Sequence, residues 1–408
     1  MGGADFVNVL YSKFLISDPD DPTWFWRDRF FLDPGHMSPM LYSVLALAGK
    51  YTVEELKEFR QWGSVTPGHP EVDQARGVEN TSGPLGQGHA MAVGAAIAER
   101  MFAQRFGELF AHKTYAFISD GGIQEEIAQG AGRLAGFLKL HNLIMFYDCN
   151  DVQLSTMVDE ITTEDYEAKY RAWGWNVLTI DGNDPVAISQ ALTSAISETE
   201  KPTLIIGRTV MGKGCVNADG ESWERRTSTH GQPISKSGAD YAATVRNLGG
   251  DPDDAWAIRD DSVELYKESA ERQRSVVKAR REAIEAWKQA NPAKAAELQD
   301  YMDLKLPEID YAAISHKANV ATRTASADVL KVLGEKVGNM IVSSADLANS
   351  DKTEAFLKVT GAITPGDFSG RFLHAGVAEL TMAAVMNGLL LHGGMLRHVG
   401  RSSFSRTI

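Results

Sequence analysis

The sequence predicts an α/β protein: a doubly wound parallel-sheet domain, then a helical connector, then the beginning of a second, incomplete α/β domain. The main observation is that short apolar runs alternate with amphipathic stretches, as buried parallel strands alternate with covering helices. Strands are predicted at 114–118, 142–147, 175–180 and 202–210, and helices at 124–140 and 185–197. The chain has 408 residues, enough for two or three domains that each bury a core.

The regions on either side of this alternation have different compositions. The first ~110 residues are predicted to be helical and rich in loops, with helices at 51–62 and 88–106 separated by a segment dense in Gly and Pro. A charged helical stretch at 251–302 indicates a connector, and a second unit follows, with a helix at 325–337, a strand at 339–343 and a helix at 377–391. We therefore expect domains at 1–250 and 321–408, joined by a connector at 251–320.

The charge balance excludes some classes of partner. Lys and Arg number 41 against 54 Asp and Glu, a net charge of −13, so bulk charge will not attract nucleic acid or an anionic membrane. Neither a signal peptide nor an apolar run long enough to span a bilayer is evident. Two cysteines argue against a disulfide scaffold. These features predict a cytoplasmic, reduced protein.

Polar side chains follow two predicted strands. Asp120 follows the strand at 114–118, and Asn150 follows the strand at 142–147. Ligands of open parallel sheets bind at the carboxyl ends of the strands, and the side-chain oxygens of Asp and Asn suit Mg²⁺ or Ca²⁺. By itself, an Asp-Gly pair after a strand is more often a turn than a metal site.

The spacing of these residues resembles a known signature. Ser119-Asp120-Gly121 followed by Cys149-Asn150 is similar to the Gly-Asp-Gly and Asn-Asn diphosphate motif of thiamine-diphosphate enzymes, with Ser119 and Cys149 as departures. Further segments, in the right order, resemble the transketolase family nearly from end to end. They are Arg27-Asp28-Arg29-Phe30, Gly35-His36-Met37-Ser38, Thr66-Pro67-Gly68-His69-Pro70-Glu71, Gly83-Pro84-Leu85-Gly86-Gln87-Gly88, Ser228-Thr229-His230-Gly231 and Ser344-Ala345-Asp346-Leu347.

The resemblance implies a set of site residues. Asp120, Asn150 and the backbone carbonyl of Val152 would bind Mg²⁺ or Ca²⁺, which holds the diphosphate of thiamine diphosphate. The further cofactor contacts implied are His36, Gly83, Pro84, Leu85, Gly121, His230 and Glu379. Glu379 would hydrogen-bond the aminopyrimidine ring and, with His69 and His230, be catalytic. His69, His230, Arg323 and Ser350 would bind the sugar phosphate substrate.

Plainer interpretations of the same residues exist. A glutamate at the start of a helix, such as Glu379, often only complements the helix dipole. A lone histidine in a glycine-rich loop is usually a turn or surface residue. The plainer interpretation of Arg323 is a charged residue on the surface without a ligand. The three histidines each lie in a segment that resembles the family, which favours the functional interpretation.

The resemblance also implies an activity and an assembly. The activity is the transfer of a two-carbon ketol unit from a ketose phosphate to an aldose phosphate in the pentose phosphate pathway. It is expected in a homodimer in which Glu379 acts across the subunit interface. Two alternatives remain: a non-catalytic truncated product or interaction fragment, and one half of a split transketolase.

The chain is expected to be truncated at both ends relative to the family. A helical arm would precede Met1, and the rest of the pyrimidine-binding domain and a third domain would follow. Residues 401–408 do not resemble the apolar continuation of the family, and one deleted base in a plausible coding sequence reproduces all of them. We therefore expect this tail to be out of frame, and this chain to be an inactive fragment.

Overall fold

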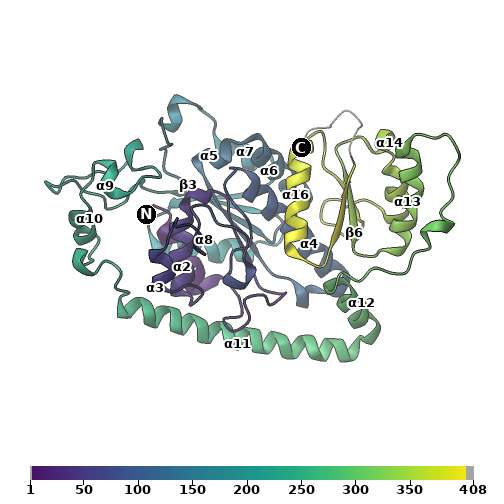
Figure 1. Ribbon diagram of the computed structural model, residues 1–408, viewed down its shortest axis with the longest axis horizontal. Coiled ribbons are helices and arrows are strands. Elements are labelled where there is room, and N and C mark those ends of the chain that lie inside the picture. Colours follow the sequence, from purple (N-terminus) through teal and green to yellow (C-terminus); the bar gives the residue numbers. More distant parts are fainter. Residues whose placement is uncertain (1, 401–408) are drawn as a thin grey trace.

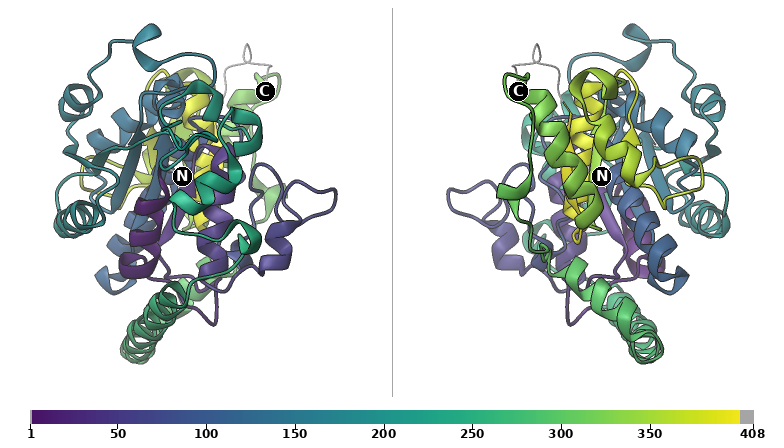
Figure 2. Two further views of the ribbon diagram at one scale, coloured as in Figure 1. Left: turned by 90° about the vertical axis from the view of Figure 1, so that its left-hand side faces the viewer. Right: turned by 90° about the vertical axis from the view of Figure 1, so that its right-hand side faces the viewer.

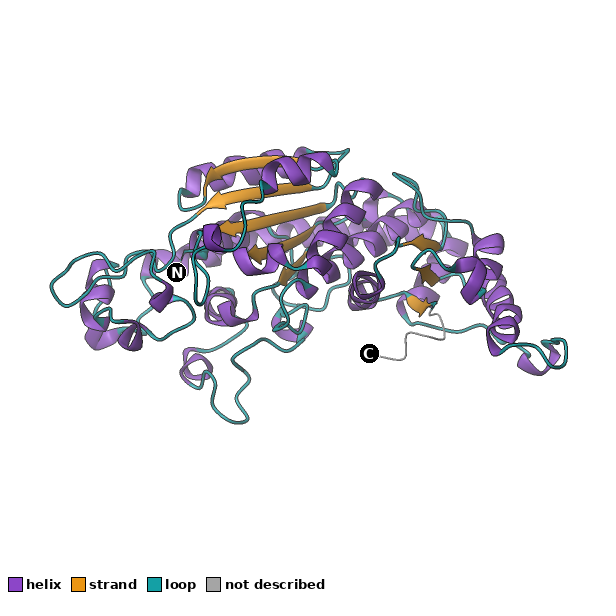
Figure 3. Ribbon diagram, turned by 90° about the horizontal axis from the view of Figure 1, so that it is seen from above, coloured by secondary structure: helices purple, strands orange, loops and turns teal. Residues whose placement is uncertain are grey.

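The computed structural model describes residues 2–400, so the reading-frame prediction for residues 401–408 lies outside the described residues. The strands form two sheets, each of parallel strands, and helices lie between the two sheets (Figure 3). The predicted α/β class with parallel sheets is therefore confirmed. Within residues 2–400, no helix has both the length and the apolar character needed to cross a membrane.

The first sheet has five parallel strands in the order β1-β2-β3-β5-β4. β2 and β3 are buried along their whole lengths, as strands covered by helices on both faces must be. The strands are β1 (Arg29–Leu32), β2 (Thr114–Ser119), β3 (Leu143–Cys149), β4 (Asn176–Asp181) and β5 (Thr203–Arg208). The helices of this domain are α1 (Ala4–Val9), α2 (Ser38–Leu47), α3 (Val53–Lys57), α4 (Gln87–Phe106), α5 (Asp120–Gln124), α6 (Glu126–Leu138), α7 (Tyr166–Ala172), α8 (Pro185–Ser197), α9 (Ile234–Ser237) and α10 (Tyr241–Asn247).

Three local predictions differ from the structure. The first ~110 residues contain β1, a buried edge strand that the helical and loop-rich interpretation missed. The helix expected at 51–62 is limited to α3, which begins with a capping box between Thr52 and Glu55 and ends before the fully exposed Trp62. The helix expected at 124–140 is α6, which begins only at Glu126, because the extended Glu125 separates it from α5, which ends at Gln124.

Helix α4 lies in the centre of the molecule and is buried on nearly every side. Its amino end is fixed by Asp33, which follows β1 and accepts hydrogen bonds from the backbone amides of Gly86 (3.1 Å) and His89 (3.2 Å). The His89 side chain is fully buried, and neither ring nitrogen has a hydrogen-bond partner among the described residues. The core next to α4 therefore contains an imidazole that makes no hydrogen bond to any described residue.

The connector contains the longest helix, α11 (Asp260–Ala290), followed by α12 (Pro292–Met302). In Figure 1, α11 runs along the lower edge of the first domain, and in Figure 2 it is seen nearly end-on at that edge. Tyr266, Ser269, Gln273, Val277 and Ile284 are its buried residues. Because they recur at helical spacing, α11 contacts the domain with one face and exposes the rest.

The second sheet has three parallel strands in the order β7-β6-β8. Its elements are α13 (Thr322–Lys336), β6 (Met340–Ser344), α14 (Ala348–Asp351), α15 (Glu354–Thr360), β7 (Phe372–His374), α16 (Glu379–His392) and β8 (Leu396–Val399). The sequence predicted only the strand that became β6, so the structure adds β7 and β8. The second domain therefore has a three-stranded parallel sheet packed with helices.

Helix α16 packs against α4 and joins the two domains (Figure 1). Gly94 of α4 faces the backbone of Val385, and Gly388 of α16 faces the backbone of Met91. A methyl group at either glycine would overlap a carbonyl oxygen of the other helix. The crossing therefore depends on the absence of two side chains.

A buried polar cluster lies beside this crossing. Arg29 donates from Nη1 to Nε2 of His112 (2.6 Å) and from Nη2 to the carbonyl oxygen of His392 (2.8 Å). The Nε2 atoms of His112 and His392 lie 3.1 Å apart. β1, the segment before β2 and the end of α16 thus meet at one point.

Candidate active site

The carboxyl ends of β2 and β3 bring two of the predicted metal ligands together. Asp120, at the start of α5, accepts hydrogen bonds at Oδ2 from the backbone amides of Asn150 and Asp151, both at 3.0 Å. Its Oδ1 accepts a hydrogen bond from the hydroxyl of Tyr147 (2.5 Å). These three donors fix the carboxylate at the sheet edge, as the strand-end argument predicted.

The electrostatic environment of Asp120 suits a cation. The side chain is only 2% exposed, and burial raises its pKa to about 7. The three groups that donate to it are neutral, and among residues 2–400 no lysine or arginine forms an ion pair with this carboxylate. A divalent cation would stabilise the ionised form, and the available donors are the hard oxygens that Mg²⁺ or Ca²⁺ prefers. The residues present therefore fit a metal ion.

Asn150 and Val152 complete this loop. The Asn150 side chain is buried, and its Oδ1 accepts a hydrogen bond from the backbone amide of Val152 (3.1 Å). The Val152 side chain is also buried, and the residue forms an isolated bridge with Met157. The side-chain oxygen of Asn150 therefore lies in the same tight turn as Val152, while its backbone amide contacts Asp120.

The glycine-rich segment approaches the same edge of the sheet. A Cβ on Gly121 would lie 3.1 Å from the Leu85 side chain, so these two predicted cofactor contacts are neighbours. Gly83 has φ +147°, which favours glycine, and a Cβ there would lie 3.8 Å from Nδ1 of His69. Pro84 is exposed between Gly83 and Leu85.

Two of the predicted histidines face each other. The rings of His36 and His230 are 5.0 Å apart between centroids, and within the described part of the chain Nδ1 of His230 is buried without a hydrogen-bond partner. Burial lowers the pKa of His36 to about 4, and it lowers the pKa of His230 as well. Both imidazoles are therefore neutral near pH 7 and can accept a proton. His69 is exposed beside Gly35.

Two adjoining pockets open at this place. One, of about 210 Å³, is lined by His36, Asp120, Gly121, Asn150, Val152 and His230 among others. The other, of about 460 Å³, shares His36, Gly121 and His230 with it and adds Leu85. Most of the predicted first-domain site residues therefore surround one continuous cleft.

The predicted residues of the second domain lie elsewhere. Glu379, Arg323 and Ser350 are exposed and line neither of these pockets. Glu379 begins α16 beside Val377, which is 79% exposed, and Leu380, which is 50% exposed. Within one chain the structure does not bring these three residues to the cleft.

The sequence analysis missed several residues at the site. Tyr147 was placed only in a strand, although its hydroxyl reaches Asp120. Asp151 belongs to a group with Asp120 and Cys149 whose ligand atoms all lie within 4.8 Å of one another. The Cys149 thiol also accepts a hydrogen bond from Arg208 (2.9 Å). The position of Asp151 directly after the predicted ligand Asn150 could have identified it as a residue of the site.

Two family models match the chain. Residues 1–307 match "Transketolase, thiamine diphosphate binding domain", and residues 318–406 match "Transketolase, pyrimidine binding domain". The residues that line the cleft lie within the range matched by the first family model, and Glu379, Arg323 and Ser350 lie within the range matched by the second.

Individual proteins are similar over almost the whole chain. The transketolase of Geobacillus stearothermophilus is 38% identical over 97% of this chain and 59% of its own length. Transketolase 2 of Escherichia coli K12 is 38% identical over 97% of this chain and 60% of its own length. The chain therefore spans about 60% of the length of these relatives.

Solved structures have the same fold. The transketolase of Leishmania mexicana superposes with a TM-score of 0.91 at 32% identity, covering 98% of this chain and 60% of that one. A Pichia stipitis transketolase in complex with sedoheptulose-7-phosphate superposes with a TM-score of 0.89 at 34% identity, with the same coverage.

Proposed function

The chain belongs to the transketolase family, and on this basis we propose that it serves the transfer of a two-carbon ketol unit from a ketose phosphate to an aldose phosphate. The observation that carries the proposal is the buried pair Asp120 and Asn150 at adjoining strand ends, within the segment that matches the thiamine diphosphate binding domain. We further propose a cytoplasmic location and a role in the pentose phosphate pathway.

We propose that Asp120, Asn150 and the carbonyl of Val152 hold Mg²⁺ or Ca²⁺, and that this ion holds the cofactor diphosphate. Gly83, Pro84, Leu85 and Gly121 would then contact the cofactor where missing or short side chains allow backbone approach. Bound thiamine diphosphate supplies the electron sink that carbon–carbon bond cleavage next to a carbonyl requires. The protein contributes the position of that group and an environment with little water.

The histidines would handle protons. His36 and His230 are neutral near pH 7 because burial lowers the pKa of both, so each can take a proton from a sugar hydroxyl. His69 lies near the cleft and is exposed, as a residue that meets an entering substrate must be. Arg323 and Ser350 carry donor types that suit a sugar phosphate, which is the kind of ligand present in the Pichia stipitis complex.

A homodimer would bring Glu379 to the cleft. Glu379 lies outside the cleft of its own chain, and apolar Val377 and Leu380 are exposed beside it. Burial of this patch against a second copy would place a glutamate next to the partner's cofactor. The metal side and the Glu379 side of each site would then belong to different chains.

Calorimetry of thiamine diphosphate binding in the presence of Mg²⁺ tests the metal assignment. Asp120→Ala should abolish metal-dependent binding, with the far-ultraviolet circular dichroism of the parent retained. Asp159→Ala, which removes an exposed carboxylate in the loop after Asn150, is the matched control and should bind like the parent. Equal affinity in Asp120→Ala and the parent would overturn the assignment.

We also propose that residues 1–408 assayed alone turn over slowly, because the matched span is only about 60% of each relative. Transfer depends on holding both ends of the cofactor, and a misplacement of ~1 Å can cost ~10²-fold in rate. Turnover of xylulose phosphate at an ordinary enzymatic rate would refute the non-catalytic alternative and leave the family assignment intact.

A further inference from the structure

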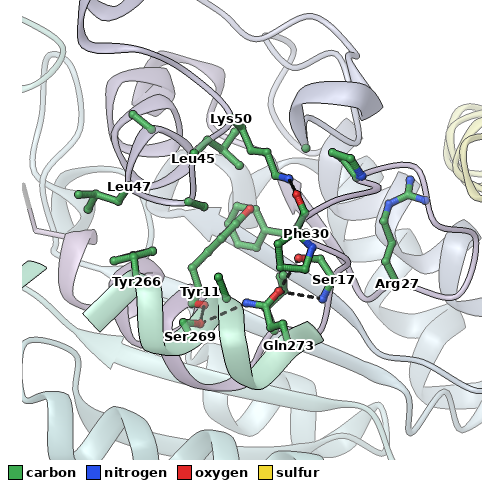
Figure 4. Close-up of a pocket in the computed structure, with 18 of the residues that line it drawn as sticks. Tyr11, Ser17, Arg27, Phe30, Leu45, Leu47, Lys50, Tyr266, Ser269 and Gln273 are labelled. Carbon is green, nitrogen blue, oxygen red and sulfur yellow. Dashed lines mark hydrogen bonds between the residues drawn. The ribbon is translucent and has the colours of Figure 1, made fainter. Parts of the chain in front are cut away.

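A third pocket, of about 530 Å³, lies between α11 and the first domain (Figure 4). It shares no lining residue with the two pockets of the candidate active site. Its volume is within the range of small-molecule sites, ~300–1,000 Å³. The proposed function gives this pocket no role.

The walls of the pocket are mainly apolar. Tyr11 comes from the amino-terminal helical segment, Phe30 from β1 and Leu45 from α2, and all three are buried. On the opposite side, α11 presents the small side chains of Ser269 and Ala270. Because these side chains are short, the helix covers the space between the three large ones without filling it.

One side of the pocket is a rigid polar chain. Gln273 accepts hydrogen bonds at Oε1 from the backbone amide (3.3 Å) and hydroxyl (2.8 Å) of Ser17 and donates from Nε2 to Ser269 (3.2 Å). Ser269 in turn donates to the carbonyl oxygen of Tyr11 (3.3 Å). Figure 4 shows this chain below Phe30. The contacts fix α11 over the pocket, so the cavity is preformed.

Lys50 differs from the other cations that line the pocket. Arg27 pairs with Glu79 and Arg274 with Asp20, while Lys267 has Glu264 at 3.8 Å. Among residues 2–400, the Lys50 ammonium has one hydrogen-bond partner, the carbonyl oxygen of Pro19 (2.8 Å).

The three acids that interact electrostatically with Lys50 already have guanidinium partners. Asp18 and Asp21 pair with Arg281, and Asp20 pairs with Arg274. An ammonium group has three donors, so Lys50 retains two for an incoming acceptor. Burial also lowers the pKa of Lys50, and an anion beside it would offset that effect.

We propose that this pocket binds a small amphipathic carboxylate. Its apolar body packs among Tyr11, Phe30 and Leu45, and its carboxylate accepts hydrogen bonds from Lys50. The charge of Lys50 selects the acid over a neutral molecule of the same shape.

Titration calorimetry with two matched probes tests the proposal on the 1–408 chain. The probes are 4-phenylbutyrate and the neutral 4-phenylbutan-1-ol. The acid should bind at least tenfold more tightly than the alcohol, because hydrogen bonds to charged groups are among the strong ones. Hydrogen exchange of residues 258–274 should slow when the acid binds.

Variants locate the site and its charge. Lys50→Met should weaken binding of the acid by about tenfold to a hundredfold and leave binding of the alcohol unchanged. Ala270→Phe, which fills the space beneath α11, should weaken both probes; Ala270→Met is the smaller variant if phenylalanine prevents folding. Lys288→Met removes a lysine charge on α11, outside the pocket, and should bind both probes like the parent.

The outcomes are decisive in either direction. Absence of binding by the acid, or binding unaffected by both Ala270 variants, would overturn the pocket as the site. Equal affinity of the parent for acid and alcohol, or unchanged acid binding in Lys50→Met, would overturn the carboxylate. Loss of acid binding in Lys50→Met alone, with retained alcohol binding, would support both parts.

Discussion

Replacing His89 with leucine should stabilise this protein. The His89 side chain is fully buried on α4, and neither ring nitrogen has a hydrogen-bond partner among residues 2–400. A buried polar group without a partner costs about 1–3 kcal/mol, and leucine has a similar size without that group. His89→Leu should therefore raise the free energy of unfolding at pH 7.5 by an amount of that order.

The gain should be larger in acid. Burial lowers the pKa of His89 from its usual 6.5 to about 3, so between these values the unfolded chain binds a proton that the folded chain does not. The stability from this shift is present above pH 6.5 and is lost as the pH falls toward 3. At pH 5 the difference is about 1.5 pH units at about 1.4 kcal/mol each, or about 2 kcal/mol. The leucine variant does not lose this stability of about 2 kcal/mol, because leucine binds no proton.

Urea denaturation at pH 7.5 and pH 5 measures both effects. The difference in free energy of unfolding between His89→Leu and the parent should grow by about 2 kcal/mol from the higher to the lower pH. His316→Leu, at an exposed position in the connector, should show no such growth. A constant difference, or a leucine variant less stable than the parent at both values, would refute the reasoning.

Two other substitutions test the packing of α16 and the surface beside Glu379. Gly388→Ala should destabilise the protein by about 1–3 kcal/mol in urea denaturation, because overlap with the backbone of Met91 outweighs the helix propensity of alanine, about 1 kcal/mol. Asn387→Ala is the control variant, and a Gly388→Ala variant more stable than the parent would contradict the packing argument. Val377→Asp should lower the fraction of dimer that sedimentation velocity detects, whereas Val186→Asp, at an exposed position on α8, should leave that fraction unchanged. The same association in both variants would argue against the proposed interface.

The sequence predicted the elements whose apolar patterns are local and missed those that depend on distant partners. β2, β3 and α8 were found because their apolar patterns are local. β1 and β8 contain Arg29 and Arg397, which local hydropathy places outside a sheet. The buried Arg29 guanidinium donates hydrogen bonds to the nearby carbonyls of Phe25 and Arg27 and also to His112 and His392, which lie far along the chain.

The same distinction applies to the site. Asp120 and Asn150 were predicted as neighbours because parallel strands end at one edge. No local pattern places His36 beside His230, and only the family resemblance suggested that pairing. Glu379 lies outside the cleft of its own chain, so its predicted role awaits a test on the assembled protein.

The Arg29, His112 and His392 cluster has a consequence for domain exchange between relatives. Each member is buried and has the others as partners, so replacing one leaves polar atoms unpaired on both sides of the domain boundary. Substitutions there should be non-additive by about 0.5–3 kcal/mol. A chimera that takes its second domain from a protein without a histidine at the end of α16 would keep the carbonyl that Arg29 contacts but would lose the ring that faces His112, and would need a matching change at His112. Compatibility of the two domains therefore depends on a pair of side chains that no single grafted segment contains.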